Sequence, residues 1–218
     1  AMKFSKCKRF IVEDFIEKKY PQLSGDIFVY DGKIIAYYLG DQRNDTKNNP
    51  FIPSSLNYPS LLPEELHEKI RLDLQRVIDK LKIRFGEFNI EVIVDGNDQI
   101  YLMEFWARNG DYCIPEIIKW ASNLDLMKMS IDACMGVVPS VDRKEIDKFY
   151  SSCMIHSNKN GKFKELKLDQ SISEYIIEFR LKVKKGDDVY KFTDSHCTVG
   201  VGLLKFPNEA TRNRILDR

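Results

Sequence analysis

The sequence lacks several patterns that would assign it to a class at once. Its 218 residues carry a formal net charge of +1, so no excess charge would draw the chain to nucleic acid or to an anionic membrane. No apolar run approaches the roughly 20 residues of a membrane-spanning helix. No signal-peptide pattern opens the sequence, and it contains no internal repeat. We therefore expect a soluble, cytoplasmic protein that binds neither nucleic acid nor a membrane.

The cysteines also lack a recognisable arrangement. They are an odd number, are widely separated and include no Cys-x-x-Cys pair (Cys7, Cys113, Cys134, Cys153 and Cys197). This spacing disfavours a disulfide framework or a zinc site and is typical of buried thiols in a reducing compartment. The composition, 43% hydrophobic and 31% charged, suits one large globular domain or two small ones.

Alternating apolar residues predict strands near the start of the sequence. "RFIVEDFI" (9–16) suggests a strand that runs into a turn, and "GDIFVYDGKIIAYYLG" (25–40) suggests a β-hairpin. The two runs of the hairpin meet at Asp31-Gly32, a pair that suits a tight turn with positive φ. The polar stretch 41–60, rich in Asn, Pro and Ser, predicts a long loop.

Helical spacing follows this polar stretch. A helix is predicted from 63 to 81, because apolar residues recur there every three or four positions. After a second hairpin, another helix is predicted from 115 to 135, ended by Gly136, and a short one over 142–150. Short β-rich runs make up the remainder, so the order of elements favours the α+β class.

The second hairpin, "FNIEVIVDGNDQIYLMEFWAR" (88–108), keeps one glutamate in each of its two apolar runs. Side chains alternate faces along a strand, and residues directly opposite each other share a face. With the turn centred on 95–98, Glu91 opposes Leu102. Glu91 and Glu104 then lie on one face, diagonal to each other and about 7 to 8 Å apart.

These two carboxylates would repel each other unless they are solvated, one is protonated, or a cation lies between them. A solvent-exposed face with incidental acids is one explanation. Arg108, four residues past Glu104, favours a site instead. A cation or a phosphate held there would meet two acids and an arginine together.

The hairpin and the residues after it, "FNIEVIVDGNDQIYLMEFWARNGDYCIPEII", resemble the metal-binding hairpin of ATP-grasp enzymes. In that family a strand with an acid or Gln precedes a strand ending in Glu-x-Asn-x-Arg, a glycine-containing loop and a helix. Upstream, "FIVEDFI" resembles the hinge that joins the two lobes around adenine, and "QLSGDIFVYDGKII" resembles the strand pair after it. Together these segments are similar to the carboxylate-amine ligase and carbamoyl-phosphate-synthase-like branch.

The resemblance implies an α+β fold in two domains. Residues 1–139 would be an ATP-grasp large lobe, an antiparallel sheet with flanking helices, and residues 140–218 a small β-rich C-terminal domain. An N-terminal domain and a small lobe with a phosphate-binding lysine would precede Arg9 in the full-length protein. We therefore expect this chain not to be catalytic alone. Whether it forms a homodimer is left open.

The resemblance also implies ATP and one or two Mg²⁺ ions as cofactors. Glu91 and Glu104 would hold Mg²⁺ between the ATP phosphates. Arg108 would be the catalytic residue that contacts phosphate or the acyl phosphate. The residues implied for the adenine and ribose pocket are Glu13, the backbone near Phe15, and Gln22.

The implied activity is the ATP-dependent ligation of a small-molecule carboxylate to an amine or a thiol, through an acyl phosphate. One residue departs from the pattern: Trp106 stands where Asn is usual, and indole cannot ligate a metal. The alternative is therefore a degenerate, non-catalytic nucleotide-binding or interaction module of the same fold. A metal-dependent hydrolase that uses the two glutamates is a weaker third interpretation, because the His and Asp ligands usual in such sites are lacking.

Overall fold

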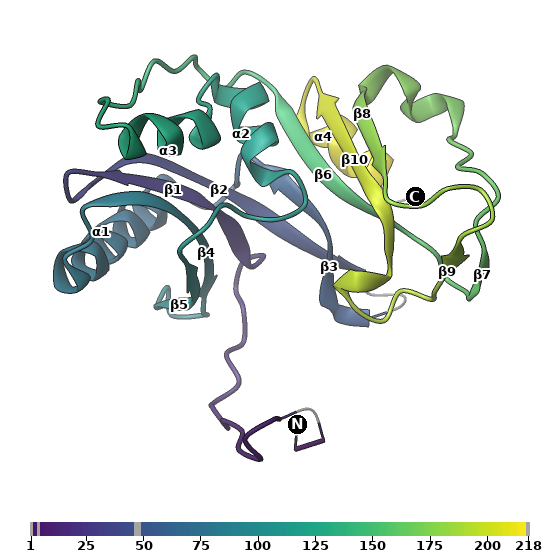
Figure 1. Ribbon diagram of the computed structural model, residues 1–218, viewed down its shortest axis with the longest axis horizontal. Helices are drawn as coiled ribbons and strands as arrows, with labels where there is room; N and C mark the ends of the chain where they lie inside the picture. Colours follow the sequence, from purple (N-terminus) through teal and green to yellow (C-terminus); the bar gives the residue numbers. More distant parts are fainter. Residues whose placement is uncertain (1, 4, 46–48, 217–218) are drawn as a thin grey trace.

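The computed structural model describes residues 2–3, 5–45 and 49–216 (Figure 1). Its framework is an eight-stranded sheet with the strand order β5-β4-β1-β2-β3-β6-β10-β8, in which neighbouring strands are antiparallel. In that order the strands are Ile100–Trp106, Phe85–Val94, Leu23–Tyr30, Lys33–Asp45, Asn49–Tyr58, Phe149–His156, Thr198–Phe206 and Ile176–Leu181. A separate two-stranded ribbon pairs β7 (Gly161–Lys162) with β9 (Asp188–Val189).

Helices cover both faces of this sheet. Helix α1 (Glu64–Leu81) packs on one face, while α2 (Ile114–Ser122) and α3 (Leu126–Cys134) pack on the other. The alternation of β1 explains this, because Ile27 contributes to the core under α1 and the next residue, Phe28, to the core under α2 and α3. The expected antiparallel sheet with flanking helices is confirmed.

The first hairpin and the first helix are also confirmed. β1 and β2 pair antiparallel and are joined by Asp31 and Gly32, whose φ angles of 47° and 77° are both positive. Along α1 the apolar residues spaced four apart are buried (Leu66, Ile70, Leu74 and Ile78). The helix ends at Lys82, which adopts the left-handed conformation.

The strand predicted over residues 9–16 is wrong. These residues form no strand or helix, and Phe15 is 81% exposed. Their apolar side chains alternate as in a strand, but a strand needs a neighbour to pair with. In the described part of the chain this segment pairs with no strand, and Figure 1 shows it leading away from the sheet.

The long loop predicted over 41–60 is also wrong. β2 continues to Asp45, and β3 occupies most of the remaining stretch; residues 46–48 lie outside the described part of the chain. β3 pairs with both β2 and β6. The proline at position 53 is accommodated because Pro53 lies where the register between β2 and β3 shifts, which is where sheets tolerate proline.

The helix predicted from 115 to 135 is divided into α2 and α3. Asn123 adopts a left-handed φ of 70° after α2, and the Asp125 side chain then accepts a hydrogen bond from Lys128 N to cap α3. Apolar spacing continues across this break and concealed it. No helix forms over 142–150, because that stretch runs extended into β6, and a last helix, α4 (Glu209–Leu216), was not predicted.

The sheet runs across the predicted domain boundary at residue 139. β6 pairs with β3, so β6, β10 and β8 extend the sheet that β1 to β5 begin. Figure 1 shows these three strands on the right, with α4 behind them. The division into two domains stays a prediction. In the described part of the chain, no helix is sufficiently long and apolar to span a bilayer.

Gly25 of β1 lies so close to the backbone of β2 that it yields a stability prediction. A Cβ atom there would lie 2.0 Å from the carbonyl oxygen of Tyr38, which is backbone of the neighbouring strand. We expect Gly25→Ala to lower the free energy of unfolding by about 2 kcal/mol in urea titrations, because overpacking forces the strands apart. Gly96→Ala is the control, since a Cβ there meets nothing within 4 Å. Equal losses in the two variants would contradict this explanation.

Candidate functional site

The two glutamates of the second hairpin face each other directly. Glu91 of β4 and Glu104 of β5 are Cα partners, whereas Val92 pairs with Leu102. The register therefore shifts at Met103, which is left without a partner. The prediction that both carboxylates share a face is confirmed, but the diagonal arrangement with Glu91 opposite Leu102 is wrong, because this bulge was not visible in the sequence.

Glu91 is half-buried and lies between two glutamine side chains. Its Oε2 accepts a hydrogen bond from Gln22 Nε2 at 2.7 Å, and its Oε1 accepts one from Gln42 Nε2 at 3.1 Å. Burial raises the pKa of Glu91, and the negative charge of Glu104 raises it further, while the two amides lower it. Gln22, predicted to contact ribose, thus contacts the predicted metal ligand. Gln42 was missed because the stretch that contains it was predicted to be a loop.

Glu104 is exposed and has a different partner. Its Oε2 accepts a hydrogen bond from Trp106 Nε1 at 2.6 Å, and the guanidinium of Arg108 lies 5.9 Å from the centre of a ring of Trp106. The tryptophan that replaces the usual Asn therefore uses one oxygen of the second glutamate.

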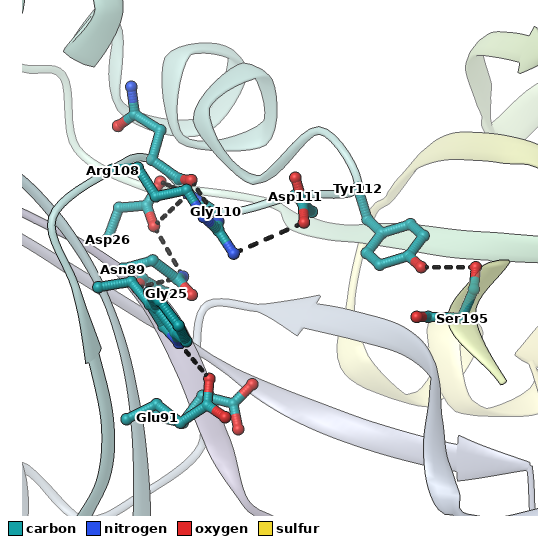
Figure 2. A network of polar contacts seen from close by, with 12 residues as sticks. Gly25, Asp26, Asn89, Glu91, Arg108, Gly110, Asp111, Tyr112 and Ser195 are labelled. Atoms are coloured by element: carbon teal, nitrogen blue, oxygen red, sulfur yellow. Dashed lines mark hydrogen bonds and ion pairs between the residues drawn. The ribbon is translucent and has the colours of Figure 1, made fainter. Parts of the chain in front are cut away.

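Arg108 begins the loop between β5 and α2. Its Nη1 donates to the carbonyl oxygen of Asn109 at 2.7 Å, and its Nη2 lies 3.7 Å from Asp111 Oδ2, as Figure 2 shows for Asp111. The side chain stays about half exposed. The guanidinium is thus directed by its own loop and keeps further donors for an anion.

These groups line a common cleft of about 130 Å³. Its walls come from β1 to β6, the loop before α2 and the start of α2, and include Gln42, Glu91, Glu104, Arg108 and Asp111. The structure therefore brings together the predicted residues Glu91, Glu104 and Arg108. It does not bring Glu13 and Phe15 there, because both lie on the exposed N-terminal segment.

The carboxylate oxygens of the cleft suit Mg²⁺ better than a metal ion that takes all of its ligands from protein side chains. In the described part of the chain, no three His, Cys, Asp or Glu side chains are grouped to hold a metal. Two carboxylates are sufficient for Mg²⁺, which takes phosphate and water oxygens for its other ligands. The pair Glu91 and Glu104 also carries two opposed negative charges that a cation would neutralise.

A larger open groove of about 940 Å³ adjoins the cleft. The two cavities share Ser55 and Met154. The groove is lined in part by basic side chains, among them Arg43, Lys159 and Lys164. It therefore offers room for a second molecule beside the two glutamates.

Asp26 is a buried acid that sequence reasoning missed. It lies in the middle of β1 with no exposed surface, and it accepts hydrogen bonds from Asn89 Nδ2 at 2.9 Å and from the backbone N–H of Gly110 at 2.9 Å (Figure 2). Burial raises the pKa of Asp26 to about 6, although these bonds and the charge of Arg108 act in the opposite direction. An acid within the apolar run "GDIFVY" was the available signal.

The two glutamines beside Glu91 yield a testable prediction. Because they donate to the ionised carboxylate, replacing Gln42 by Leu should raise the pKa of Glu91 further. The measurement is an NMR titration of the Glu91 carboxyl carbon. Gln99→Leu is the control, because Gln99 Nε2 donates only to the Ile100 carbonyl among its described contacts. A Glu91 titration unchanged by Gln42→Leu would show that the contact does not form in solution.

Comparison with known proteins identifies the fold. No protein-family model matches the sequence, and no curated protein sequence matches it. Phosphoribosylglycinamide synthetase from Anaerococcus prevotii superimposes with a TM-score of 0.78 at 22% identity, over 99% of this chain and 55% of that one. L-amino acid ligase from Bacillus licheniformis has a TM-score of 0.75 at 18% identity, over 93% of this chain and 51% of that one.

A third similar structure is the biotin carboxylase domain of 2-oxoglutarate carboxylase from Hydrogenobacter thermophilus, in complex with MgADP, ADP and bicarbonate. Its TM-score is 0.64 at 16% identity, over 90% of this chain and 44% of that one. The chain thus spans about half the length of these structures. These structures are ATP-grasp enzymes, and this chain has the fold of the part of them that it covers.

Proposed function

We propose that this chain supplies the metal and phosphate site of an ATP-dependent ligase. In the full-length protein the enzyme would join a small-molecule carboxylate to an amine or a thiol through an acyl phosphate. The observation that carries the proposal is the direct opposition of Glu91 and Glu104 in a cleft that also contains Arg108. The similarity to ligase structures, one of which holds MgADP, supports it.

Five side chains in or beside the cleft have a role in this proposal. Glu91 and Glu104 would hold Mg²⁺, and Gln22 and Gln42 orient the Glu91 carboxylate in advance. When bound, Mg²⁺ would offset the negative charge of the ATP phosphates. Arg108 would donate hydrogen bonds to the transferred phosphoryl group, where its positive charge stabilises the charge that develops during transfer.

The remaining parts of the reaction lie beside or beyond this cleft. The carboxylate and amine substrates would enter by the adjoining basic groove, which borders the cleft at Ser55 and Met154. A small lobe with a phosphate-binding lysine would cover the nucleotide in the full-length protein. The exposed N-terminal segment with Glu13 and Phe15 would then contact the adenine, and this chain alone would bind nucleotide without turnover.

Calorimetry on the 218-residue chain tests the first step. We expect Mg²⁺-dependent binding of ADP that weakens tenfold or more in Arg108→Ala, because a charge-assisted hydrogen bond to phosphate contributes about 1.5–3 kcal/mol. Arg84→Ala is the matched control, since Arg84 is exposed and pairs with Asp31 at the β1–β2 turn. ADP release by the full-length protein, measured over a panel of carboxylates and amines, tests the reaction. Absence of both binding and ADP release would contradict the proposal.

The alternative function, a degenerate nucleotide-binding or interaction module, rests on Trp106. Its indole N–H uses an oxygen of Glu104 where an Asn side chain would offer another ligand oxygen. We expect Trp106→Asn to strengthen Mg²⁺-dependent ADP binding several-fold, measured by the same calorimetry. Trp106→Phe is the control, because it removes the N–H without adding a ligand. Binding by the Asn variant but not by the wild type would favour the degenerate module. Weaker binding by the Asn variant would give Trp106 a role of its own.

A further inference from the structure

The buried carboxylate of Asp26 lies beneath the loop that carries Arg108. Its Oδ1 accepts hydrogen bonds from Asn89 Nδ2 and from the Gly110 N–H, each at 2.9 Å, and its Oδ2 lies 3.1 Å from the same N–H (Figure 2). Every described hydrogen-bond partner of this carboxyl group is therefore a donor. The ionised form is the stronger acceptor for these donors, because a charged acceptor strengthens each hydrogen bond.

Asn89 completes the connection between Asp26 and the loop. Its side-chain amide donates both to Asp26 and to the carbonyl oxygen of Gly25 at 2.9 Å, which fixes the orientation of the amide. Its backbone N–H donates to the carbonyl oxygen of Arg108 at 2.7 Å. The backbone is thus held at Arg108 by Asn89 and two residues later, at Gly110, by Asp26.

Gly110 packs so closely against Asp26 and Asn89 that a side chain at this position would crowd them. A Cβ atom there would lie 2.7 Å from Asn89 Nδ2 and 2.7 Å from Ile114 Cδ1. Farther along, Tyr112 and Cys113 have φ angles of 56° and 63°, which non-glycine residues adopt only when surrounding contacts impose them. The conformation of residues 107–113 therefore depends on contacts such as those to Asp26.

We propose that Asp26 is a positioning residue, which through Gly110 and Asn89 holds residues 107–113 so that Arg108 faces the phosphate in the cleft. The proposal rests on the function proposed above and extends it. Asp26 itself does not line the cleft. Its carboxylate also places a negative charge beneath Arg108, which favours the position of the guanidinium.

The charge of Asp26 gives this role a measurable pH dependence. Burial raises its pKa from 3.8 to about 6, Glu87 on β4 raises it, and Arg108 lowers it. The stability that this group contributes is therefore fully present below about pH 4 and is lost as the pH rises through 6. At neutral pH the ionised carboxylate lowers stability while it holds the loop. A carboxylate that served only to stabilise the fold would instead raise the stability of the fold at neutral pH.

The test compares the 218-residue wild type with Asp26→Asn, which keeps the shape of the side chain and removes the charge. We expect the Gly110 amide resonance of the wild type to titrate near pH 6 and that of the variant to show no inflection. At pH 7 the variant should bind MgADP about tenfold more weakly, by calorimetry, while its urea midpoint is equal to or higher than that of the wild type. A purely structural role would lower affinity and stability together.

Glu87→Gln provides a second variant that leaves the hydrogen bonds from Asn89 and Gly110 to Asp26 unchanged. Removing the negative charge of Glu87 should move the Gly110 inflection to lower pH, and this result decides the matter if Asp26→Asn does not fold. Equal binding of MgADP by the wild type and by Asp26→Asn would overturn the positioning role and leave the proposed function standing. A Gly110 resonance of the wild type that does not titrate would do the same. A wild type that does not bind MgADP would instead remove the proposed function and this role with it.

Discussion

The repulsion between two carboxylates across one β-ladder is the constraint around which this cleft is organised. Glu91 and Glu104 are direct partners, and burial of Glu91 strengthens their repulsion because water cannot screen it fully. Two glutamine amides donate to Glu91, and an indole N–H donates to Glu104. These neutral donors orient the carboxylates without neutralising them, and paired carboxylate oxygens are ligands that suit a divalent cation.

The sheet brings these side chains together from distant parts of the chain. β1 lies between β2 and β4. Gln22, just before β1, and Gln42, near the end of β2, therefore reach the same carboxylate on β4. Helices pack on both faces of β1 and bury its apolar side chains. The same central strand carries Asp26, whose ionised form lowers stability at neutral pH. Retaining such a group is understandable where it positions a loop for function.

Predictions from local sequence pattern were correct wherever the residues of one segment determine its structure. The Asp31-Gly32 hairpin, the apolar stripe of α1 and the shared face of Glu91 and Glu104 were all predicted, because turn chemistry and side-chain periodicity are local properties. Predictions failed where pairing with a neighbouring strand determines the structure of a segment. Residues 9–16 have strand-like alternation but pair with no described strand, and the polar stretch after residue 41 forms β3 because β2 and β6 lie on either side of it.

For the site, the sequence by itself determined the chemical types: two glutamates on one face, an arginine just past the end of the strand, and a tryptophan two residues after the second glutamate. Only the tertiary structure decided that the glutamates are directly opposed, that Gln22 and Gln42 bind Glu91, and that Asp26 holds the arginine loop. The physical reason is that a bulge, a strand order and a buried hydrogen bond depend on contacts between residues far apart in the chain, which no local periodicity records.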